Sequence, residues 1–369
     1  MTNYLRILVL TKRQYTNRDL IDDRFGRIRE IPMQLARNGH SVRGLCLSYR
    51  RRKDVVFQDE GVRWESINAG PLFIGGLLQF LLRSMQRAVG ADVIWACSDS
   101  LFGIIAFFVG WLFGVPVVFD LYDNFESFLL ARMPVFRSLY RGVVRKCDAI
   151  TVASRPLHDL VASYHRTKEV FVLENAVDVS LFHPIDKNDC RAQFKLPSQA
   201  LIVGTAGALF KNRGIEVLFR AFKLLASKYP DVHLAVAGPR DVPIPAHPRI
   251  HDMGILSYDQ VPKFLNALDI GIICNRASAF GNYCFPQKAR ELMACNVPIV
   301  AARVGSMERL LEDHPGWLYN PSSPHDLVRV IANRLKNRST GYGPLPSWSD
   351  MAGALEGICL SLSNPCTRG

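Results

Sequence analysis

The 369-residue sequence contains no short-period repeat and no closely paired cysteines. Its nine cysteines stand singly, so the pattern indicates neither a zinc knuckle nor a dithiol redox motif. Their odd number argues against a disulfide framework, and we expect buried thiols in a reducing cytosol. The first ten residues also lack the apolar segment and cleavage site of a secretory leader, and we expect none.

Composition excludes a disordered or fibrous chain, because 49% of the residues are hydrophobic and 21% are charged. The length exceeds what one ordinary core organises and predicts two domains. The net charge of +12 favours nucleic acid, anionic lipid or phosphorylated substrates as partners, without choosing among them. No recognisable nucleic-acid module accompanies that charge, so we expect no nucleic acid.

One hydrophobic run, residues 101–119, is long enough to span a bilayer. Gly114-Val115-Pro116 interrupts it near its end, and Asp120 follows it. A buried helix up to about Phe113, a turn and a buried strand over Val117–Phe119 explain the run equally well. We favour this helix and strand over a membrane span.

Buried strands alternate with helices along both halves of the chain, which predicts parallel sheets covered on both faces. The polar stretch 182–200 is the best linker. We therefore predict two doubly wound α/β domains over residues 1–182 and 183–345, and a C-terminal helix within 346–369 that packs back on the first domain. Ligands of such sheets bind at the carboxyl ends of the strands, so the cleft between the two domains is the expected site.

The most informative stretch starts at Phe285-Pro286-Gln287-Lys288 and ends at Ala302. A helix that begins here offers free N–H groups and about half a positive charge to an anion. The stretch resembles the signature of glycosyltransferase family 4, whose members are retaining enzymes of GT-B architecture, in the branch with a Pro-x-Lys-x-x-Glu motif. The resemblance implies that the helix faces the diphosphate of a nucleotide-sugar donor and that Glu291 binds its ribose. An ordinary exposed helix glutamate is the alternative.

The resemblance extends over nearly the whole chain. Asn175-Ala176-Val177-Asp178 resembles the family's interdomain Asn-Gly-Val-Asp motif, with Ala176 in place of glycine. Weaker matches keep the family's order and spacing: Gly39-His40-Ser41-Val42, Cys147–Ser154, Ala267–Ile272 and Gly305-Ser306-Met307-Glu308. The resemblance therefore implies the GT-B fold, with two Rossmann-like domains and an interdomain cleft.

The phosphate-binding stretch of the family corresponds to residues 207–214. Arg213 falls on the family's lysine, whereas Ala208 falls on its arginine and loses that charge. Cations are needed because the leaving nucleoside diphosphate gains negative charge as the glycosidic bond breaks. We predict Arg213 and Lys288 as catalytic cations; a solvated basic loop is the alternative. The expected donor-binding residues are Gly207, Lys211, Arg213, Phe285, Pro286, Gln287, Lys288 and Glu291.

Two departures from the family concern the reacting sugar. Tyr283 stands where many members have a second glutamate, and Tyr122 stands where they have a histidine. Asp123 is retained and is predicted to bind acceptor hydroxyls or take a proton, with helix capping as the alternative. Asp123 is therefore the third predicted catalytic residue, and the expected acceptor-side residues are Arg18, Arg24, Tyr122 and Glu126.

The loop after the first strand also departs from the family, because residues 12–18 contain no glycine. Backbone approach to a phosphate is harder there, and cationic side chains would approach it or bind the acceptor instead. No Asp-x-Asp triplet occurs, and no His, Cys or carboxylate cluster has metal-ligand spacing. We expect a metal-independent enzyme without a cofactor.

These features together predict transfer of a sugar from a nucleotide-sugar donor to a glycan or lipid-linked acceptor, in polysaccharide or lipopolysaccharide synthesis. Basic clusters predict peripheral contact of a cytoplasmic enzyme with an anionic membrane; a generic basic surface is the alternative. The clusters are Arg50–Lys53, Arg83 with Arg87, and Arg141 with Arg145 and Lys146. Two other functions stay open: a non-catalytic partner subunit, suggested by Ala208, Tyr122 and Tyr283, and a GT-B nucleotide-sugar epimerase.

Overall fold

The structure, a computed structural model, describes residues 4–15, 18–24, 26–50, 52–128, 131, 133–164, 166 and 168–363. The chain divides into two compact units, Met1–Asn175 with Trp348–Gly369, and Ala176–Ser347. Residues 176–182, which the sequence assigned to the first domain, belong to the second unit, where Val177 and Phe182 are buried in its core. The last helix belongs to the first unit, and the return to that unit comes at Trp348.

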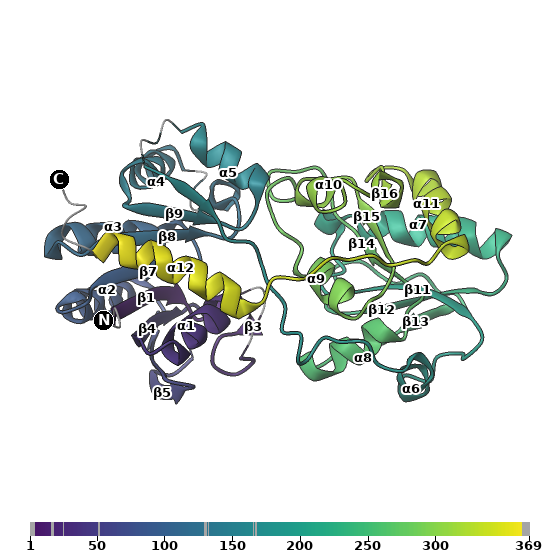
Figure 1. Cartoon of the computed structure of the whole chain (residues 1–369), viewed down its shortest axis with the longest axis horizontal. Coiled ribbons are helices and arrows are strands. Elements are labelled where there is room, and N and C mark those ends of the chain that lie inside the picture. Colours follow the sequence, from purple (N-terminus) through teal and green to yellow (C-terminus); the bar gives the residue numbers. More distant parts are fainter. Residues whose placement is uncertain are drawn as a thin grey trace. The chain divides into compact units, whose positions relative to one another are not determined.

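Within the described residues, the first unit is built on an eight-stranded sheet in the order β10-β9-β8-β7-β1-β4-β6-β5 (Figure 1). All neighbouring strands are parallel except β5 and β6. The strands are β1 (Arg6–Lys12), β4 (Ser41–Ser48), β5 (Val55–Asp59), β6 (Val62–Asn68), β7 (Val93–Ala96), β8 (Val117–Leu121), β9 (Ala149–Val152) and β10 (Val170–Val172), beside the short pair β2 (Gln14–Tyr15) and β3 (Arg18–Asp19).

Helices cover both faces of this sheet. They are α1 (Arg27–Arg37), α2 (Ile74–Ala88), α3 (Ser100–Phe113), η1 (Phe125–Ser127), α4 (Pro134–Lys146), α5 (Arg155–Ala162) and α12 (Trp348–Ser363). Helix α12 packs along α1, whereas α3 packs between α2 and α4. Because parallel crossovers are right-handed, α1 and the α2–α3–α4 layer lie on opposite faces.

The long apolar run is confirmed as a helix followed by a strand. Helix α3 ends at Gly114, whose left-handed backbone (φ 67°) suits a glycine, and strand β8 begins at Val117. Asp99 caps the start of α3 by accepting a hydrogen bond from the backbone N–H of Leu101. Among the described residues, no helix is both long and apolar enough to cross a bilayer.

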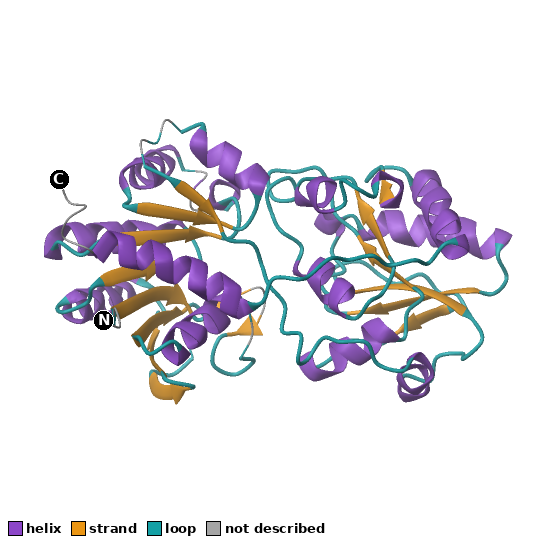
Figure 2. Cartoon of the chain, in the orientation of Figure 1, coloured by secondary structure: helices purple, strands orange, loops and turns teal. Residues whose placement is uncertain are grey.

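The second unit is built on a six-stranded parallel sheet in the order β13-β12-β11-β14-β15-β16, counted over the part of the chain that is described (Figure 2). Its strands are β11 (Leu201–Ala206), β12 (Val232–Ala237), β13 (Ile250–Asp252), β14 (Ile270–Ile273), β15 (Ile299–Ala302) and β16 (Leu318–Tyr319). Its helices are α6 (Lys187–Gln193), η3 (Lys211–Arg213), α7 (Ile215–Lys228), η4 (Tyr258–Gln260), α8 (Val261–Asn266), α9 (Gln287–Ala294), α10 (Ser306–Leu310), η5 (Pro315–Trp317) and α11 (Pro324–Lys336).

Both sheets are doubly wound, as the sequence predicts. In the first unit the chain runs from β1 outward to β4 and β6, and later from β7 outward to β8, β9 and β10. In the second unit it runs from β11 to β13 and then from β14 to β16. The winding direction therefore reverses between β1 and β7, and between β11 and β14. Crevices outside the carboxyl ends of the strands at such switch points are where open α/β sheets bind ligands.

Candidate functional site

Two glycines shape the carboxyl edge of the second sheet. Gly207 follows β11 with φ 109°, and Gly238 follows β12 with φ 134°. A Cβ on Gly238 would lie 2.0 Å from the carbonyl oxygen of Gly207, so no larger residue fits there. Gly207 itself is exposed, and a Cβ on it would meet only the end of the Lys288 side chain, at 3.7 Å. The backbone after β11 is thus open to a ligand beside a lysine.

Lys288, the second residue of α9, reaches across this edge. Its Nζ donates a hydrogen bond to Thr205 Oγ1 on β11 at 3.3 Å. Burial lowers the pKa of Lys288, and the neighbouring positive charge of Arg213 lowers it further. Two cations held this close repel each other, and an anion placed between them would relieve that repulsion.

Arg213 is held at the end of η3 by an aromatic side chain. Its guanidinium carbon lies 3.7 Å from the centroid of the Phe280 ring. Gly214 follows with φ 76°, and a Cβ there would lie 3.2 Å from the carbonyl oxygen of Asn275. The 211–214 turn therefore packs closely against the loop that leads into α9. Sequence reasoning missed Phe280 and Thr205, because neither position carries a charge or a motif.

The start of α9 lies beside these cations. No side chain caps the helix, and Pro286 occupies its N-cap position. Phe285 is buried, and Gln287 donates from Nε2 to the carbonyl oxygen of Ala176 at 2.7 Å. Glu291 has only 8% of its surface exposed, so it is not the ordinary exposed helix glutamate of the alternative interpretation.

Lys211 stands apart from this group. Its side chain is exposed, and its backbone N–H donates to Asp241 Oδ1 at 2.8 Å. The structure therefore brings Gly207, Arg213 and Lys288 together at the end of β11. Lys211 contributes to the turn through its backbone N–H, and among the described contacts its side chain has none with this group.

At the carboxyl edge of the first sheet, three strands meet around Ser98. This residue follows β7 with φ 100°, a strained conformation for a side chain that is not glycine. Its carbonyl oxygen accepts a hydrogen bond from the Tyr122 hydroxyl at 2.6 Å, and its Oγ contacts Thr11 Oγ1. Tyr122 is 5% exposed, so its hydroxyl supports the edge rather than facing outward.

Lys12, at the end of β1, is a cation that the predicted site residues omit. Its Nζ lies 5.8 Å from the centroid of the Phe128 ring. Burial raises the pKa of Asp99, and the positive charge of Lys12 partly opposes that increase. Tyr49 donates a hydrogen bond to Asp99 Oδ2 at 3.4 Å. Lys12, Tyr49 and Asp99 thus come together at the switch point of the first sheet.

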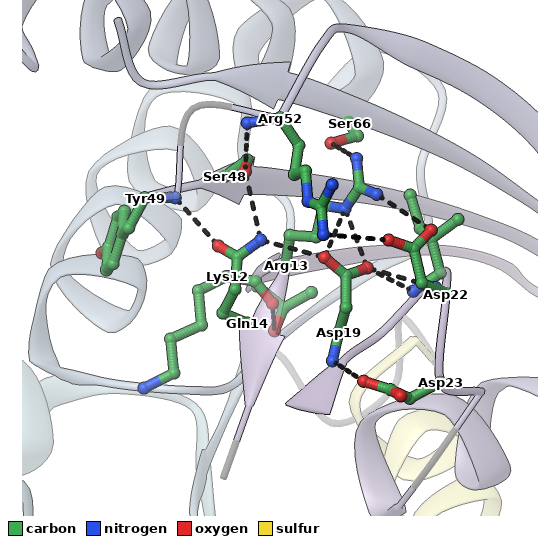
Figure 3. Close-up of polar contacts among 12 residues, drawn as sticks. Lys12, Arg13, Gln14, Asp19, Asp22, Asp23, Ser48, Tyr49, Arg52 and Ser66 are labelled. Carbon is green, nitrogen blue, oxygen red and sulfur yellow. Dashed lines mark hydrogen bonds and ion pairs between the residues drawn. The ribbon is translucent and has the colours of Figure 1, made fainter. Parts of the chain in front are cut away.

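The loop after β1 is held by a polar network rather than by glycine (Figure 3). Arg13 Nε donates to both carboxylate oxygens of Asp19, at 2.9 and 3.0 Å. Gln14 Nε2 donates to Asp19 and to Ser48 Oγ at the end of β4, both at 3.1 Å. Lys12 extends away from this network in Figure 3. Arg13 is buried and holds the loop in place. Lys12 is half-buried, and its side chain lies outside this polar network.

Of the other predicted acceptor-side residues, Glu126 has a structural partner. It accepts two hydrogen bonds from Arg141, at 2.6 and 2.8 Å. Burial would raise the pKa of Glu126, but the hydrogen bond from Arg141 helps to lower it. Asp123 is half-buried, Arg18 lies 3.6 Å from Asp23, and Arg24 is exposed. Thr16 and Asn17 of the same predicted loop lie outside the described residues.

Two further features bear on what this chain binds. The described residues contain no group of three His, Cys, Asp or Glu side chains placed to hold a metal ion. A hollow of about 380 Å³ lies in the first unit, lined by Val89, Asp92, Phe113 and Pro116 among others. It opens at the amino ends of β7 and β8, the edge opposite Ser98, and it contains none of the predicted site residues.

Two family models match the chain. Residues 27–176 match the "Glycosyl transferase 4-like domain", and residues 200–337 match "Glycosyl transferases group 1". The first model lies almost entirely in the first unit and the second lies wholly in the second unit. Each of the two units therefore matches a glycosyl transferase domain model.

Curated relatives include two proteins named D-inositol 3-phosphate glycosyltransferase. The one from Mycobacteroides abscessus is 25% identical over 371 residues, covering 88% of this chain and 81% of its own. The one from Arthrobacter is 25% identical over 258 residues, covering 62% of this chain and 59% of its own. The chain thus spans between about three fifths and four fifths of these two relatives.

Solved structures share the fold. The crystal structure of Anabaena HepE in complex with UDP superposes with a TM-score of 0.71 at 17% identity, and the match covers 97% of each chain. Sucrose-phosphate synthase from Thermosynechococcus elongatus gives a TM-score of 0.69 at 18% identity, also covering 97% of each chain. Identities this low establish the arrangement of helices and strands within the chain and nothing about its substrate.

Proposed function

Since the chain belongs to glycosyltransferase family 4 and has the GT-B fold of two Rossmann-like units, we propose that it moves a sugar from a nucleotide-diphosphate sugar to an acceptor, with retention of configuration. The observation that carries this proposal is the pairing of Arg213 and Lys288 beside the open backbone of Gly207. An anion relieves the repulsion between the two cations, and the diphosphate of a sugar nucleotide is an anion of this kind.

In this proposal the donor binds to the second unit. The diphosphate lies against Arg213, Lys288 and the first turn of α9, and Glu291 accepts hydrogen bonds from the ribose hydroxyls. As the glycosidic bond breaks, negative charge grows on the departing nucleoside diphosphate, and the two cations stabilise that charge most in the transition state. The structures of Anabaena HepE in complex with UDP and with UDP-glucose support this class of donor.

The acceptor binds to the first unit, at the edge formed by Lys12, Asp99 and Asp123. A carboxylate there accepts hydrogen bonds from sugar hydroxyls. A lipid-linked glycan of polysaccharide or lipopolysaccharide synthesis, met at the cytoplasmic face of a membrane, suits the net charge of +12. The reaction as proposed needs no metal ion, because cationic side chains take the place of a metal at the diphosphate; chelation with EDTA should leave the rate unchanged.

Donor binding is tested by thermal shift with UDP-, GDP- and ADP-sugars. A ligand at 100 times its dissociation constant stabilises the folded protein by about 2.7 kcal/mol, and one nucleotide class is expected to do so. The Lys288→Met variant should lose most of that shift, whereas Lys223→Met, on α7 and outside the site, should keep it. No shift with any nucleotide sugar would refute the proposal.

The two alternative functions give different products. A retaining transferase releases nucleoside diphosphate and places the sugar on the acceptor with its original anomeric configuration, which NMR of the product reports. A non-catalytic subunit binds the donor without turnover, and an epimerase converts the donor without any acceptor. Incubating the donor with and without a membrane extract that supplies acceptors separates the three.

A further inference from the structure

The α2–α3–α4 layer of the first unit carries an unusual number of large apolar side chains in contact with solvent. Trp111 is 73% exposed, Ile74 74% and Val135 83%. The residues that share this property on the layer and its entry loops are Leu72, Phe73, Ile74, Leu78, Leu82, Phe108, Trp111, Leu112, Phe113, Met133, Val135 and Leu139. We call this set the apolar face.

Helical spacing places these residues in stripes on the outside of the layer. On α2, Ile74, Leu78 and Leu82 recur every four residues, whereas Phe80 and Ser84, among others, are buried against the sheet. On α3, the rings of Phe108 and Trp111 lie 6.4 Å apart. Because α3 packs between α2 and α4, the stripes lie on neighbouring helices (Figure 1).

The charge of this layer has one sign. The sequences of α2, α3 and α4 contain Arg83, Arg87, Arg137, Arg141, Arg145 and Lys146, and no Asp or Glu. Two of these charges are paired with carboxylates from outside the layer: Arg87 with Glu65 at 2.5 Å, and Arg141 with Glu126 at 2.6 Å. Arg83, Arg137 and Arg145 instead donate hydrogen bonds to neutral oxygens.

These ion pairs change which basic residues are available to contact anionic lipid headgroups. The sequence pointed to Arg83 with Arg87 and to Arg141 with Arg145 and Lys146, and the structure pairs Arg87 and Arg141 with carboxylates. Arg83, Arg145 and Lys146 are exposed and lie at the border of the apolar stripes. Of the predicted Arg50–Lys53 cluster, Arg51 lies outside the described residues, and Arg52 lies 3.8 Å from Asp22.

We propose that the apolar face is the surface by which this protein inserts into an anionic lipid bilayer. The inference deepens the proposed membrane association and names the side chains that carry it: Leu78 on α2, Trp111 on α3 and Val135 on α4 enter the acyl boundary. Arg83, Arg145 and Lys146 meet the anionic headgroups. Apolar residues bordered by positive charge, with an exposed tryptophan, are the composition of interfacial membrane helices.

The charge of this surface suits a bilayer. The sequences of α2, α3 and α4 contain cations and no carboxylate, so the charge around the apolar stripes is complementary to an anionic surface. Single-sign positive charge is complementary to the cytoplasmic leaflet. The carboxyl edge of the sheet also borders the face, because α2 begins at that edge with Ile74 and α4 begins there with Pro134, followed by Val135. An acceptor anchored in the same bilayer would reach Asp123 without leaving the membrane surface.

The test is sedimentation with vesicles of phosphatidylcholine alone or mixed with phosphatidylglycerol. The intact protein should bind the mixed vesicles and be released in part by high salt. The triple variant Leu78→Glu, Trp111→Glu, Val135→Glu should bind at least about tenfold less, which corresponds to about 1.4 kcal/mol. The double variant Arg83→Gln, Lys146→Gln should lose about fivefold per charge on mixed vesicles alone, since each charge near an anionic surface contributes about 1 kcal/mol.

The matched control replaces three similarly exposed apolar residues elsewhere: Val56→Glu, Val179→Glu and Ile255→Glu. It should bind like the intact protein. Equal binding by the apolar-face triple variant would overturn the inference. A second result would also overturn it: the intact protein is a dimer in analytical ultracentrifugation, and the triple variant is a monomer that binds vesicles as well as the intact protein does. Donor-induced thermal shift of the triple variant separates this inference from the proposed function, because the donor site lies in the second unit and should respond normally.

Discussion

Gln287 donates a hydrogen bond from Nε2 to the carbonyl oxygen of Ala176 at 2.7 Å. Ala176 is the first residue of the second unit, and Gln287 is the first residue of α9. This bond fastens the point where the chain enters the unit to the start of the helix that carries the candidate donor site. On the first unit's side of the same boundary, Arg27 Nη1 donates to the Leu173 carbonyl oxygen at 2.8 Å and to Asn175 Oδ1 at 3.1 Å.

Removing that bond should impair the use of the donor more than the stability of the fold. In Gln287→Leu the chain after Asn175 is no longer fixed to α9, and the net contribution of one hydrogen bond is about 0.5–1.5 kcal/mol. We expect Tm to fall by only a few degrees, whereas kcat/KM for the donor should fall about two- to tenfold. Gln193→Leu, an exposed change at the end of α6, should leave both unchanged; equal losses in the two variants would contradict a positioning role for Gln287.

Lys288 predicts a pH dependence of donor affinity. Burial and the charge of Arg213 hold its pKa below the ordinary lysine value, so it loses its proton at a lower pH than an exposed lysine does. Only the protonated side chain attracts a diphosphate, and affinity should therefore fall as the pH rises through that lowered pKa. Lys288→Arg should keep its affinity to higher pH, because a guanidinium stays charged. Calorimetric titration of the donor across alkaline pH measures both proteins; identical profiles would exclude Lys288 from the diphosphate.

Loss of either cation should be costly for turnover. Removing one pre-placed donor of this kind commonly reduces kcat by about 10²–10³-fold. We expect losses of that order for Lys288→Met and for Arg213→Met, and a much smaller effect for Lys211→Met, whose exposed side chain lies outside the group. Steady-state release of nucleoside diphosphate gives the comparison. A larger loss for Lys211→Met than for Arg213→Met would show that the family's phosphate cation has moved to Lys211.

The sequence predicted the backbone of this protein better than its side-chain partners. The strand after residue 116 and the end of α3 follow from local rules, because Gly114-Val115-Pro116 permits a left-handed turn and forbids a longer helix. The approach of Lys288 to Gly207 follows from topology, because Gly207 follows β11 and α9 follows the neighbouring parallel strand β14. Ion pairs do not follow from either rule. Arg141 and Glu126 are 15 residues apart, and only the packing of α4 beside η1 brings them together.

The predicted acceptor side shows the same limit. A missing glycine after β1 was visible in the sequence, but the network of Arg13, Gln14 and Asp19 that replaces it depends on Ser48 at the end of another strand. Tyr122 was placed at the site by its position in a motif. Its hydroxyl donates a hydrogen bond to the carbonyl oxygen of Ser98, a residue that follows a different strand.

Glu291 should determine whether the protein distinguishes a ribose from a deoxyribose. A hydrogen bond to a charged group contributes about 1.5–3 kcal/mol, so the intact protein should bind its nucleoside diphosphate at least about tenfold more tightly than the 2′-deoxy analogue. Glu291→Gln should reduce that ratio, whereas Glu312→Gln, which is exposed, should preserve it. The measurement is competition of the two nucleotides against donor turnover. An unchanged ratio in Glu291→Gln would show that this carboxylate does not bind the ribose.

The buried pair of Arg13 and Asp19 predicts an acid-sensitive contribution to stability. Burial would raise the pKa of Asp19, but hydrogen bonds from Arg13 and from the backbone N–H groups of Ile21 and Asp22 lower it overall. A carboxyl whose pKa is lower in the folded state stabilises the protein above its unfolded pKa, and loses that contribution as the pH falls through the folded value.

Breaking the buried pair in Asp19→Asn should cost about 3–5 kcal/mol near neutral pH. The difference in Tm between the intact protein and Asp19→Asn should accordingly be largest near neutral pH and shrink below about pH 4. Asp159→Asn, on the exposed side of α5, serves as the control, and a Tm difference for Asp19→Asn that grows on acidification would show that Asp19 is protonated in the folded state.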